Sequence, residues 1–145
     1  MANWGSCDFR ELKELNERIQ RAASQQQMDK FYTDLQDDMM NALERAVKHR
    51  TPRHTGHLRR SWQRTKSVRK GKNYEATIYN NVEYAPWVEN GHRTRLNRKT
   101  GERRWVKGRY MLRRSVLEYQ RKAPAHIKIK SEEFLRKMMG GAERD

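Results

Sequence analysis

The chain has 145 residues, of which 34% are hydrophobic and 35% are charged, and it carries a formal net charge of +15. This length suits one core and is too short for two full domains. Four Trp, six Tyr and three Phe argue against wholesale disorder, and no apolar run approaches the roughly 18 residues of a membrane span. A single cysteine, Cys7, excludes an intrachain disulfide framework and a thiolate zinc site built by one chain.

Charge is divided unequally along the chain. Residues 1–50 contain eight Lys and Arg against nine Asp and Glu, a net charge of −1. Residues 51–145 contain twenty-five against nine, a net charge of +16. The basic character therefore belongs to the second part only, and within it residues 92–109 carry eight cations and one acid.

The first predicted helix covers residues 9–23. Its apolar residues recur at spacings of three and four, which places them on one stripe of a helix. Asp8 and Glu11 have the spacing of a capping box at its start. The stripe consists of Phe9, Leu12, Leu15, Ile19 and Ala22.

A second, longer helix is predicted to follow a start signal at Ser24 and Gln27. It should end near Arg50, because Pro52 disfavours helical dihedral angles at Thr51 and its ring cannot continue the hydrogen-bond ladder. This is the longest amphipathic segment that the sequence predicts. Its apolar stripe consists of Met28, Phe31, Tyr32, Leu35, Met39, Leu43, Ala46 and Val47.

The next part of the sequence has the shorter period of strands. Residues 58–68 and 73–81 carry Trp, Tyr, Thr, Val and Ile in rough alternation, and the segment between them has the Gly and Asn of a turn. This pattern predicts two antiparallel strands joined as a hairpin. Further on, extended basic residues flank Thr100 and Gly101, which predicts a second, longer hairpin or a flexible arm.

Helical spacing returns between Met111 and Tyr119 and is interrupted by Pro124, after which a short terminal helix is predicted to stop at Gly140. We therefore expect one domain over residues 1–145, built from three parts. These are a helical part (1–50), a β part (51–109) with a basic arm at about 92–109, and a C-terminal helical part (110–145).

The residue types of catalytic and metal sites are present without the spacings that such sites need. His49, His54 and His57 fall within nine residues, but no carboxylate or Cys stands at ligand spacing and the neighbouring arginines would repel a cation. Glu83 and Glu89 do not form a recognisable acid pair, and no glycine-rich phosphate loop occurs. We therefore expect no enzyme activity, no metal and no cofactor. A nuclease that uses His54 and His57 is the remaining enzymatic alternative.

A turn is predicted just after Pro52. The Thr55 hydroxyl can bond the local backbone, and Gly56 can adopt left-handed dihedral angles. Leu58 and Trp62 would then point into the core.

The basic segment at residues 92–109 has two interpretations. Cations interleaved with an aromatic residue can neutralise phosphates and release counterions, which gives salt-sensitive binding of nucleic acid without sequence preference. A basic loop can equally pair with an acidic neighbouring subunit. The candidate residues that would face DNA or a partner are Arg93, Arg95, Arg98, Lys99, Arg103, Arg104, Trp105, Lys107 and Arg109.

Three motifs occur in order over roughly residues 28–120. A Thr-Pro is followed by Thr-Gly-x-Leu at 51–58, a Tyr-Ala-x-x-Val-Glu-x-Gly box covers 84–91, and an aromatic-plus-leucine entry to the last helix covers 110–112. Their order and spacing resemble the gene-product-ten-like family of tailed-bacteriophage neck, head–tail joining and minor tail-component proteins. The motif residues are Pro52, Thr55, Gly56, Leu58, Trp62, Tyr84, Ala85, Trp87, Val88, Glu89 and Gly91.

The resemblance implies a non-enzymatic virion protein with an α+β fold, in which long amphipathic helices pack on a small antiparallel sheet and a basic hairpin arm protrudes. It implies a ring of six or twelve copies in the neck, joining the capsid connector to the tail. Its partners would be further copies of itself, other neck, connector and tail proteins, and the phage DNA that passes through the channel. Such a protein would be made in the host bacterial cytoplasm and located in the virion. The alternative is a stand-alone, sequence-nonspecific nucleic-acid-binding module.

Two further expectations follow. The acidic helical part and the basic part would be complementary in a head-to-tail contact, which is the kind of contact that closes a ring. Trp62, Tyr84 and Trp87 are expected to form the aromatic centre around which the sheet and the helices pack.

Overall fold

A computed structural model describes residues 9–54 and 56–140, so Cys7, Asp8 and Thr55 lie outside the described residues. Long helices combine with small antiparallel sheets, which confirms the α+β class. In chain order the elements are α1 (Phe9–Ala22), α2 (Gln25–Arg50), α3 (His57–Arg60), β1 (Trp62–Arg64), β2 (Val68–Lys70), β3 (Asn73–Glu75), β4 (Ile78–Asn80), α4 (Ala85–Asn90), β5 (Gly91–Arg93), β6 (Trp105–Lys107) and α5 (Met111–Gly140).

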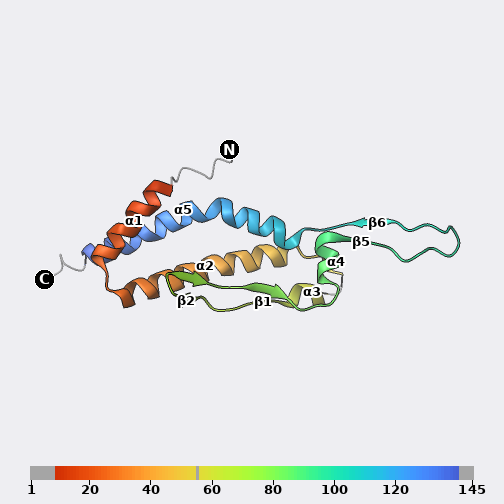
Figure 1. Cartoon of the computed structure of the whole chain (residues 1–145), viewed down its shortest axis with the longest axis horizontal. Coiled ribbons are helices and arrows are strands. Elements are labelled where there is room, and N and C mark those ends of the chain that lie inside the picture. Colours follow the sequence, from red (N-terminus) through yellow and green to blue (C-terminus); the bar gives the residue numbers. More distant parts are fainter. Residues whose placement is uncertain (1–8, 55, 141–145) are drawn as a thin grey trace.

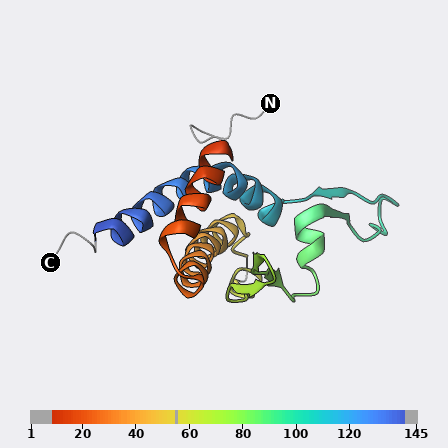
Figure 2. The ribbon, with the colours of Figure 1, turned by 60° about the vertical axis from the view of Figure 1, so that its left-hand side comes forward.

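The three long helices form the body of the molecule. Figure 1 shows α5 running along α2, with the β1–β4 strands on the opposite side of α2. In Figure 2, α1 lies across the same two helices, close to the C-terminal half of α5. Apolar stripes on each helix drive this packing, because they leave water only when they face one another.

The buried apolar residues fall into two clusters. The larger one joins the C-terminal half of α2 to the start of α5, and the smaller one joins α1 to the end of α5. The larger cluster contains Met40, Leu43, Val47, Leu58, Trp62, Ala85 and Met111, and the smaller contains Leu15, Ile19 and Leu135.

Both predicted ends of α2 are confirmed. The Ser24 Oγ accepts a hydrogen bond from the Gln27 backbone N (3.3 Å), while the Ser24 N donates to the Gln27 Oε1 (2.9 Å), so the capping box is complete. The helix ends at Arg50, and Thr51 before the proline has the extended dihedral angles that Pro52 imposes.

The first predicted hairpin is confirmed in part: residues 58–60 of its first predicted strand are helical in α3, and the remaining strands do not form one continuous sheet. β1 pairs with β4 and β2 pairs with β3, both antiparallel, and Gly71 occupies the turn with a φ of +61°. Between the two pairs, the Thr65 N donates to the Thr77 carbonyl oxygen (2.9 Å), which keeps the strands together across the break. A hydrogen bond joins the hairpin to α2: the Ser67 N donates to the Asp37 Oδ1 (2.9 Å).

The β part contains two short helices that strand periodicity does not predict. α3 begins after Gly56, whose φ of +69° turns the chain out of the loop. α4 covers most of the Tyr-Ala box and has Pro86 in its first turn, where the missing N–H costs no helical hydrogen bond.

The predicted interruption of the last helix at Pro124 was wrong, because α5 is a single helix of 30 residues with this proline inside it. A proline in a helix interior costs about 3 kcal/mol through a lost hydrogen bond and a steric clash. Burial on both sides of it, at Met111 against the C-terminal half of α2 and at Leu135 against α1 and the start of α2, holds the two halves in place. Figure 1 shows α5 bowed over α2 along its length.

Candidate functional site

A buried hydrogen bond joins the end of α2 to the first strand. The Thr51 Oγ1 donates to the Val47 carbonyl oxygen (2.7 Å) and accepts from the Trp62 Nε1 (2.9 Å). Thr51 is 3% exposed and Trp62 is 6% exposed. A buried indole N–H needs such a partner, so the Thr-Pro motif fixes the Trp as well as ending the helix. The predicted burial of Leu58 and Trp62 is confirmed.

Glu89 of the second motif caps a helix that begins 22 residues later. Its Oε2 accepts from the Leu112 N (3.0 Å) and its Oε1 accepts from the Arg113 N (2.9 Å). A carboxylate that binds two free amides in the first turn of α5 is also stabilised by the helix dipole. The backbone adds to this link, since the Tyr110 N donates to the Glu89 carbonyl oxygen (3.1 Å). Glu89 is therefore a structural anchor between α4 and α5.

Gly91 lets two backbone segments approach closely. It has a φ of +88° and a ψ of 167°, a region that is essentially restricted to glycine. A Cβ at this position would lie 2.6 Å from the Val106 carbonyl oxygen, and a Cβ at Gly108 would collide with the Glu89 carbonyl oxygen. The Glu-x-Gly pattern thus combines a helix cap with a contact that only glycine permits.

The expected aromatic centre is only partly correct. Trp62 is buried, but Trp87 is 60% exposed and Tyr84 is 38% exposed. Residues three apart share a face of a helix, so Ala85 and Val88 of α4 point to the core and Trp87 points away from it. Tyr84 precedes the helix as its N-cap residue.

Beyond α4 the chain forms the β5–β6 hairpin, residues 91–107, which extends away from the helices in Figure 1. Gly91 lies opposite Lys107 and Arg93 lies opposite Trp105. The ladder continues outward, because the Thr94 N donates to the Arg104 carbonyl oxygen (2.8 Å). Gly101 has a φ of +70° near the tip, which agrees with the predicted turn.

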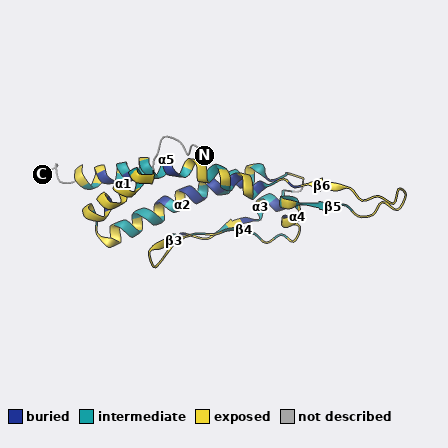
Figure 3. Cartoon of the chain, turned by 45° about the horizontal axis from the view of Figure 1, so that its top comes forward, coloured by how far each residue is buried: buried dark blue, intermediate teal, exposed yellow. Residues whose placement is uncertain are grey.

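All nine candidate residues of the basic segment are exposed, from Arg93 to Arg109. Within the described residues, none of the eight cations among them forms an ion pair. Trp105 is 62% exposed. Figure 3 shows the contrast between this exposed hairpin and the buried faces of the long helices. Binding of a partner by these residues stays a prediction.

In the helical body, unlike in the hairpin, several charged side chains form ion pairs. Hydrogen bonds from Lys122 and from Arg50 lower the pKa of Glu118 from 4.5 to about 2. Arg64 likewise bridges Asp37 (3.3 Å) and Glu44 (3.4 Å) between β1 and α2. These pairs tie neighbouring elements of the body to each other.

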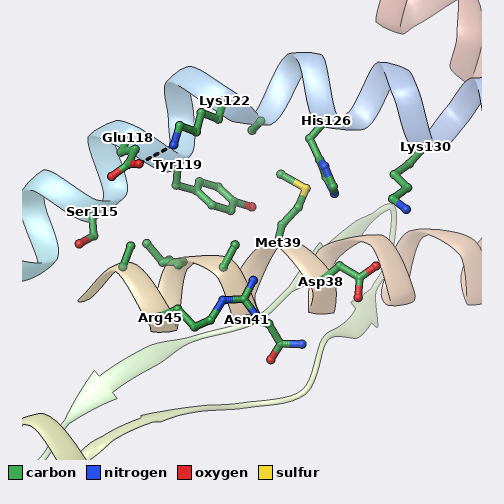
Figure 4. A pocket seen from close by; sticks show the side chains of 14 residues that line it. Asp38, Met39, Asn41, Arg45, Ser115, Glu118, Tyr119, Lys122, His126 and Lys130 are labelled. Atoms are coloured by element: carbon green, nitrogen blue, oxygen red, sulfur yellow. Dashed lines mark hydrogen bonds and ion pairs between the residues drawn. The ribbon is translucent and has the colours of Figure 1, made fainter. Parts of the chain in front are cut away.

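A groove of about 440 Å³ separates α2 from α5. Figure 4 shows Met39 and Tyr119 pointing into it from the two helices, with the Glu118–Lys122 ion pair at one edge. His126 also lines it, and its Nε2 is buried without a hydrogen-bond partner. The lining mixes apolar atoms with charges of both signs, and its Ser115 hydroxyl donates to the Met111 carbonyl oxygen (2.6 Å) rather than to His126.

The three neighbouring histidines are not assembled into a site. His49 and His54 are exposed, and the described part of the chain holds no group of three or more His, Cys, Asp or Glu that could bind a metal ion. No helix among residues 9–54 and 56–140 has the length and apolar character needed to cross a bilayer.

The comparison with known families gives one result. The model of the HK97-gp10-like family, described as "Bacteriophage HK97-gp10, putative tail-component", matches residues 13–91. That range contains most of α1, all of α2, the first hairpin and α4. No curated protein and no solved structure matched the chain significantly. Because the match covers more than half of the chain and includes both the Thr-Pro and the Glu-x-Gly motifs, the chain belongs to the HK97-gp10-like family of bacteriophage tail-component proteins.

Proposed function

We propose that this protein is a structural component of the phage neck, where copies of it form a ring that joins the capsid connector to the tail. Membership in a tail-component family supports a place in the virion. The ring, its six or twelve copies and its position in the neck are the proposed refinement. The 145 residues would act in it as one domain.

One observation carries the assembly proposal. Large apolar side chains are exposed around α4 and along the β5–β6 hairpin, outside both buried clusters. Exposed Trp and Tyr beside Arg are typical of the central residues of protein interfaces. The exposed set at this end of the molecule is Tyr84, Trp87, Leu96, Trp105 and Val106.

The unequal charge supports a head-to-tail contact between copies. Residues 1–50 are slightly acidic, while the hairpin carries eight cations against one acid. Two different surfaces that meet between neighbouring subunits make a heterologous contact, and such contacts generate closed rings when the rotation closes. Complementary potentials would also orient the subunits during assembly.

Deletion of the gene from the phage tests the proposal directly. Electron microscopy of the lysate should show full heads and separate tails, because the part that joins them is missing. Wild-type protein supplied in trans should restore joined particles. Intact virions in the absence of the protein would refute a neck role.

A stand-alone nucleic-acid-binding module is the second candidate, favoured by the exposed cations of the hairpin. It differs in assembly state, since it requires tight binding to nucleic acid by a monomer. Light scattering of the purified protein separates the two candidates before any binding measurement.

A further inference from the structure

The β5–β6 hairpin has two chemically different faces. Side chains alternate between the faces of a strand, and residues directly opposite each other share a face. Arg93 and Lys107 therefore lie on the same face as Trp105, whose ring reaches over Gly91. The next pair, Thr94 and Arg104, lies on the opposite face, and the pair beyond it in the same register, Arg95 and Arg103, returns to the first face. We call it the cationic face; it consists of Arg93, Arg95, Arg103, Trp105 and Lys107.

The other face carries one cation, Arg104, and one acid, Glu102, with Thr94 between them and the base of the hairpin. It also carries His92 and Val106, which are paired in the register, and Leu96 further out. The His92 ring lies 6.4 Å from the Trp87 ring of α4, so the part of this face with His92 and Val106 continues onto the exposed side of that helix. The two faces can therefore contact two partners at once.

Like charges meet on the cationic face. The register joins Gly91 to Lys107 and reaches Thr94 and Arg104, and its continuation by one residue would place Arg95 opposite Arg103. Like charges directly opposite each other destabilise a strand pair. An anion bound across this face would remove that repulsion, so the arrangement suits a ligand with closely spaced negative charges.

The exposed acids that a second copy offers on α1 and α2 are spread over the two helices. Several other acids of the body are already engaged, as in the Glu118 and Asp37 ion pairs, and Glu89 caps α5. Glu14 and Glu17 on α1, and Asp34 and Asp38 on α2, are exposed, so each helix provides two charges against the five cations of the hairpin's cationic face and tip. Those cations are Arg93, Arg95, Arg103, Lys107 and Lys99.

Duplex DNA has the charge spacing that this face requires. Alternate residues on one face of a strand are about 6.6 Å apart. Phosphates on one DNA strand rise only about 3.4 Å each along the axis, but the strand also winds around that axis, so neighbouring phosphates lie about 6 to 7 Å apart in space. Exposed Trp105 among the cations adds an apolar surface for contact with the deoxyribose of the backbone.

We infer that the cationic face of the β5–β6 hairpin binds the phosphate backbone of duplex DNA without sequence preference. The inference rests on the proposed neck position for the source of the DNA, which would be the phage genome in the channel. The opposite face, with His92 and Val106, and Trp87 then remain available for the neighbouring protein. Binding of this kind would hold or guide the DNA without reading its sequence.

The test is fluorescence anisotropy with a labelled 30-base-pair duplex and the full-length protein, titrated at several salt concentrations. The variant R93Q/R95Q/R103Q/K107Q removes the charges of the cationic face. The matched control K13Q/R18Q/R121Q/K137Q removes four exposed cations of α1 and α5, so both variants lose the same net charge. Thermal melts followed by circular dichroism check that both variants fold.

Wild type and the control should bind two duplexes of unrelated sequence with equal, salt-sensitive affinity. The face variant should bind at least about tenfold more weakly, and its slope of log K against log salt should be shallower by about 3.6, or 0.9 for each lost phosphate contact. No binding by wild type, or equal losses in both variants, would overturn the inference.

Two further measurements separate the rival explanations. If poly-glutamate displaces the duplex as well as unlabelled DNA does, charge for charge, the face is built for an acidic protein and the DNA inference is wrong. Light scattering of the same samples reports assembly independently. A monomer that binds DNA through the cationic face would retain the inference and refute the ring, whereas rings that do not bind DNA would do the reverse.

Discussion

The helical body and the β5–β6 hairpin use the same residue types in opposite ways. In the body, the charged side chains of Arg50, Glu118 and Lys122 pair with each other, and the Trp62 indole is buried on a hydrogen bond. In the hairpin the cations have no ion-pair partners among the described residues, and Trp105 is exposed. The body thus pairs many of its charges internally, whereas the cations and Trp105 of the hairpin remain exposed. We propose that the body supplies the stability of the fold and that the hairpin end supplies contacts with partners.

Replacing Trp62 of the body and Trp87 at the hairpin end should give the largest difference in stability between the two regions. Trp62→Ala should lower the free energy of unfolding by about 3 to 5 kcal/mol, because it empties a buried site and leaves the Thr51 hydroxyl without its donor. Trp87→Ala should change it by less than about 0.5 kcal/mol, because that side chain is mostly in solvent. Urea unfolding followed by circular dichroism measures both. Equal losses would mean that Trp87 also belongs to the folded core.

The junction between the two regions depends on Gly91. Gly91→Ala should cost about 3 kcal/mol, since the new Cβ meets the Val106 carbonyl oxygen in a conformation that only glycine adopts readily. Gly71→Ala is the control: it also has a positive φ, but nothing lies near its Cβ, so it should cost only about 1 kcal/mol. A smaller loss at position 91 than at position 71 would contradict the close approach.

The Glu89 cap should have a smaller effect. Glu89→Ala removes the acceptor for two amides of α5 and should cost about 1 to 2 kcal/mol. Hydrogen exchange should show the loss of protection at the Leu112 and Arg113 amides, with little change in α1. Unchanged exchange at those two amides would contradict the capping role.

The ion pairs of the body should appear as a pH dependence. The pKa of Glu118 is lowered from 4.5 to about 2, so its contribution to stability is fully present above pH 4.5 and is lost as the pH falls toward 2. Because solvent screens a partly exposed carboxylate, the loss should be about 1 kcal/mol or less. Urea unfolding at pH 6 and pH 3 measures it. Glu118→Gln should reduce the pH dependence, while Glu102→Gln in the hairpin, where the carboxylate has no ion pair, should leave it unchanged.

Local signals in the sequence predict the helical body well. Ser24 with Gln27 marks the start of α2 and Pro52 marks its end, because capping and the proline ring act within a few residues. The hairpin turns at Gly71 and Gly101 are local in the same sense. Pro124 misleads because distant packing, which no local signal contains, holds α5 together across it.

The candidate site was less predictable because its key contacts join residues that are far apart in sequence. Glu89 accepts a hydrogen bond from the Leu112 N at the start of α5, and Thr51 accepts one from the Trp62 indole. No periodic pattern in the sequence predicts either bond. The only available signal for Glu89 was its place in the Glu-x-Gly box. Trp87 was placed in the core because α4 is too short for its period to be read, and a shift of one position moves a side chain to the opposite face.

The central claim is that the exposed end of the molecule is completed by neighbouring copies. Negative-stain imaging of the purified protein, with subunits counted in class averages, tests it most directly. Wild type should form closed rings, and a variant with Trp87→Ser and Val106→Ser should remain folded but dissociate, since both apolar side chains lie on the face proposed for the neighbour. A wild-type protein that stays monomeric at all concentrations, or rings that persist in the variant, would contradict the claim.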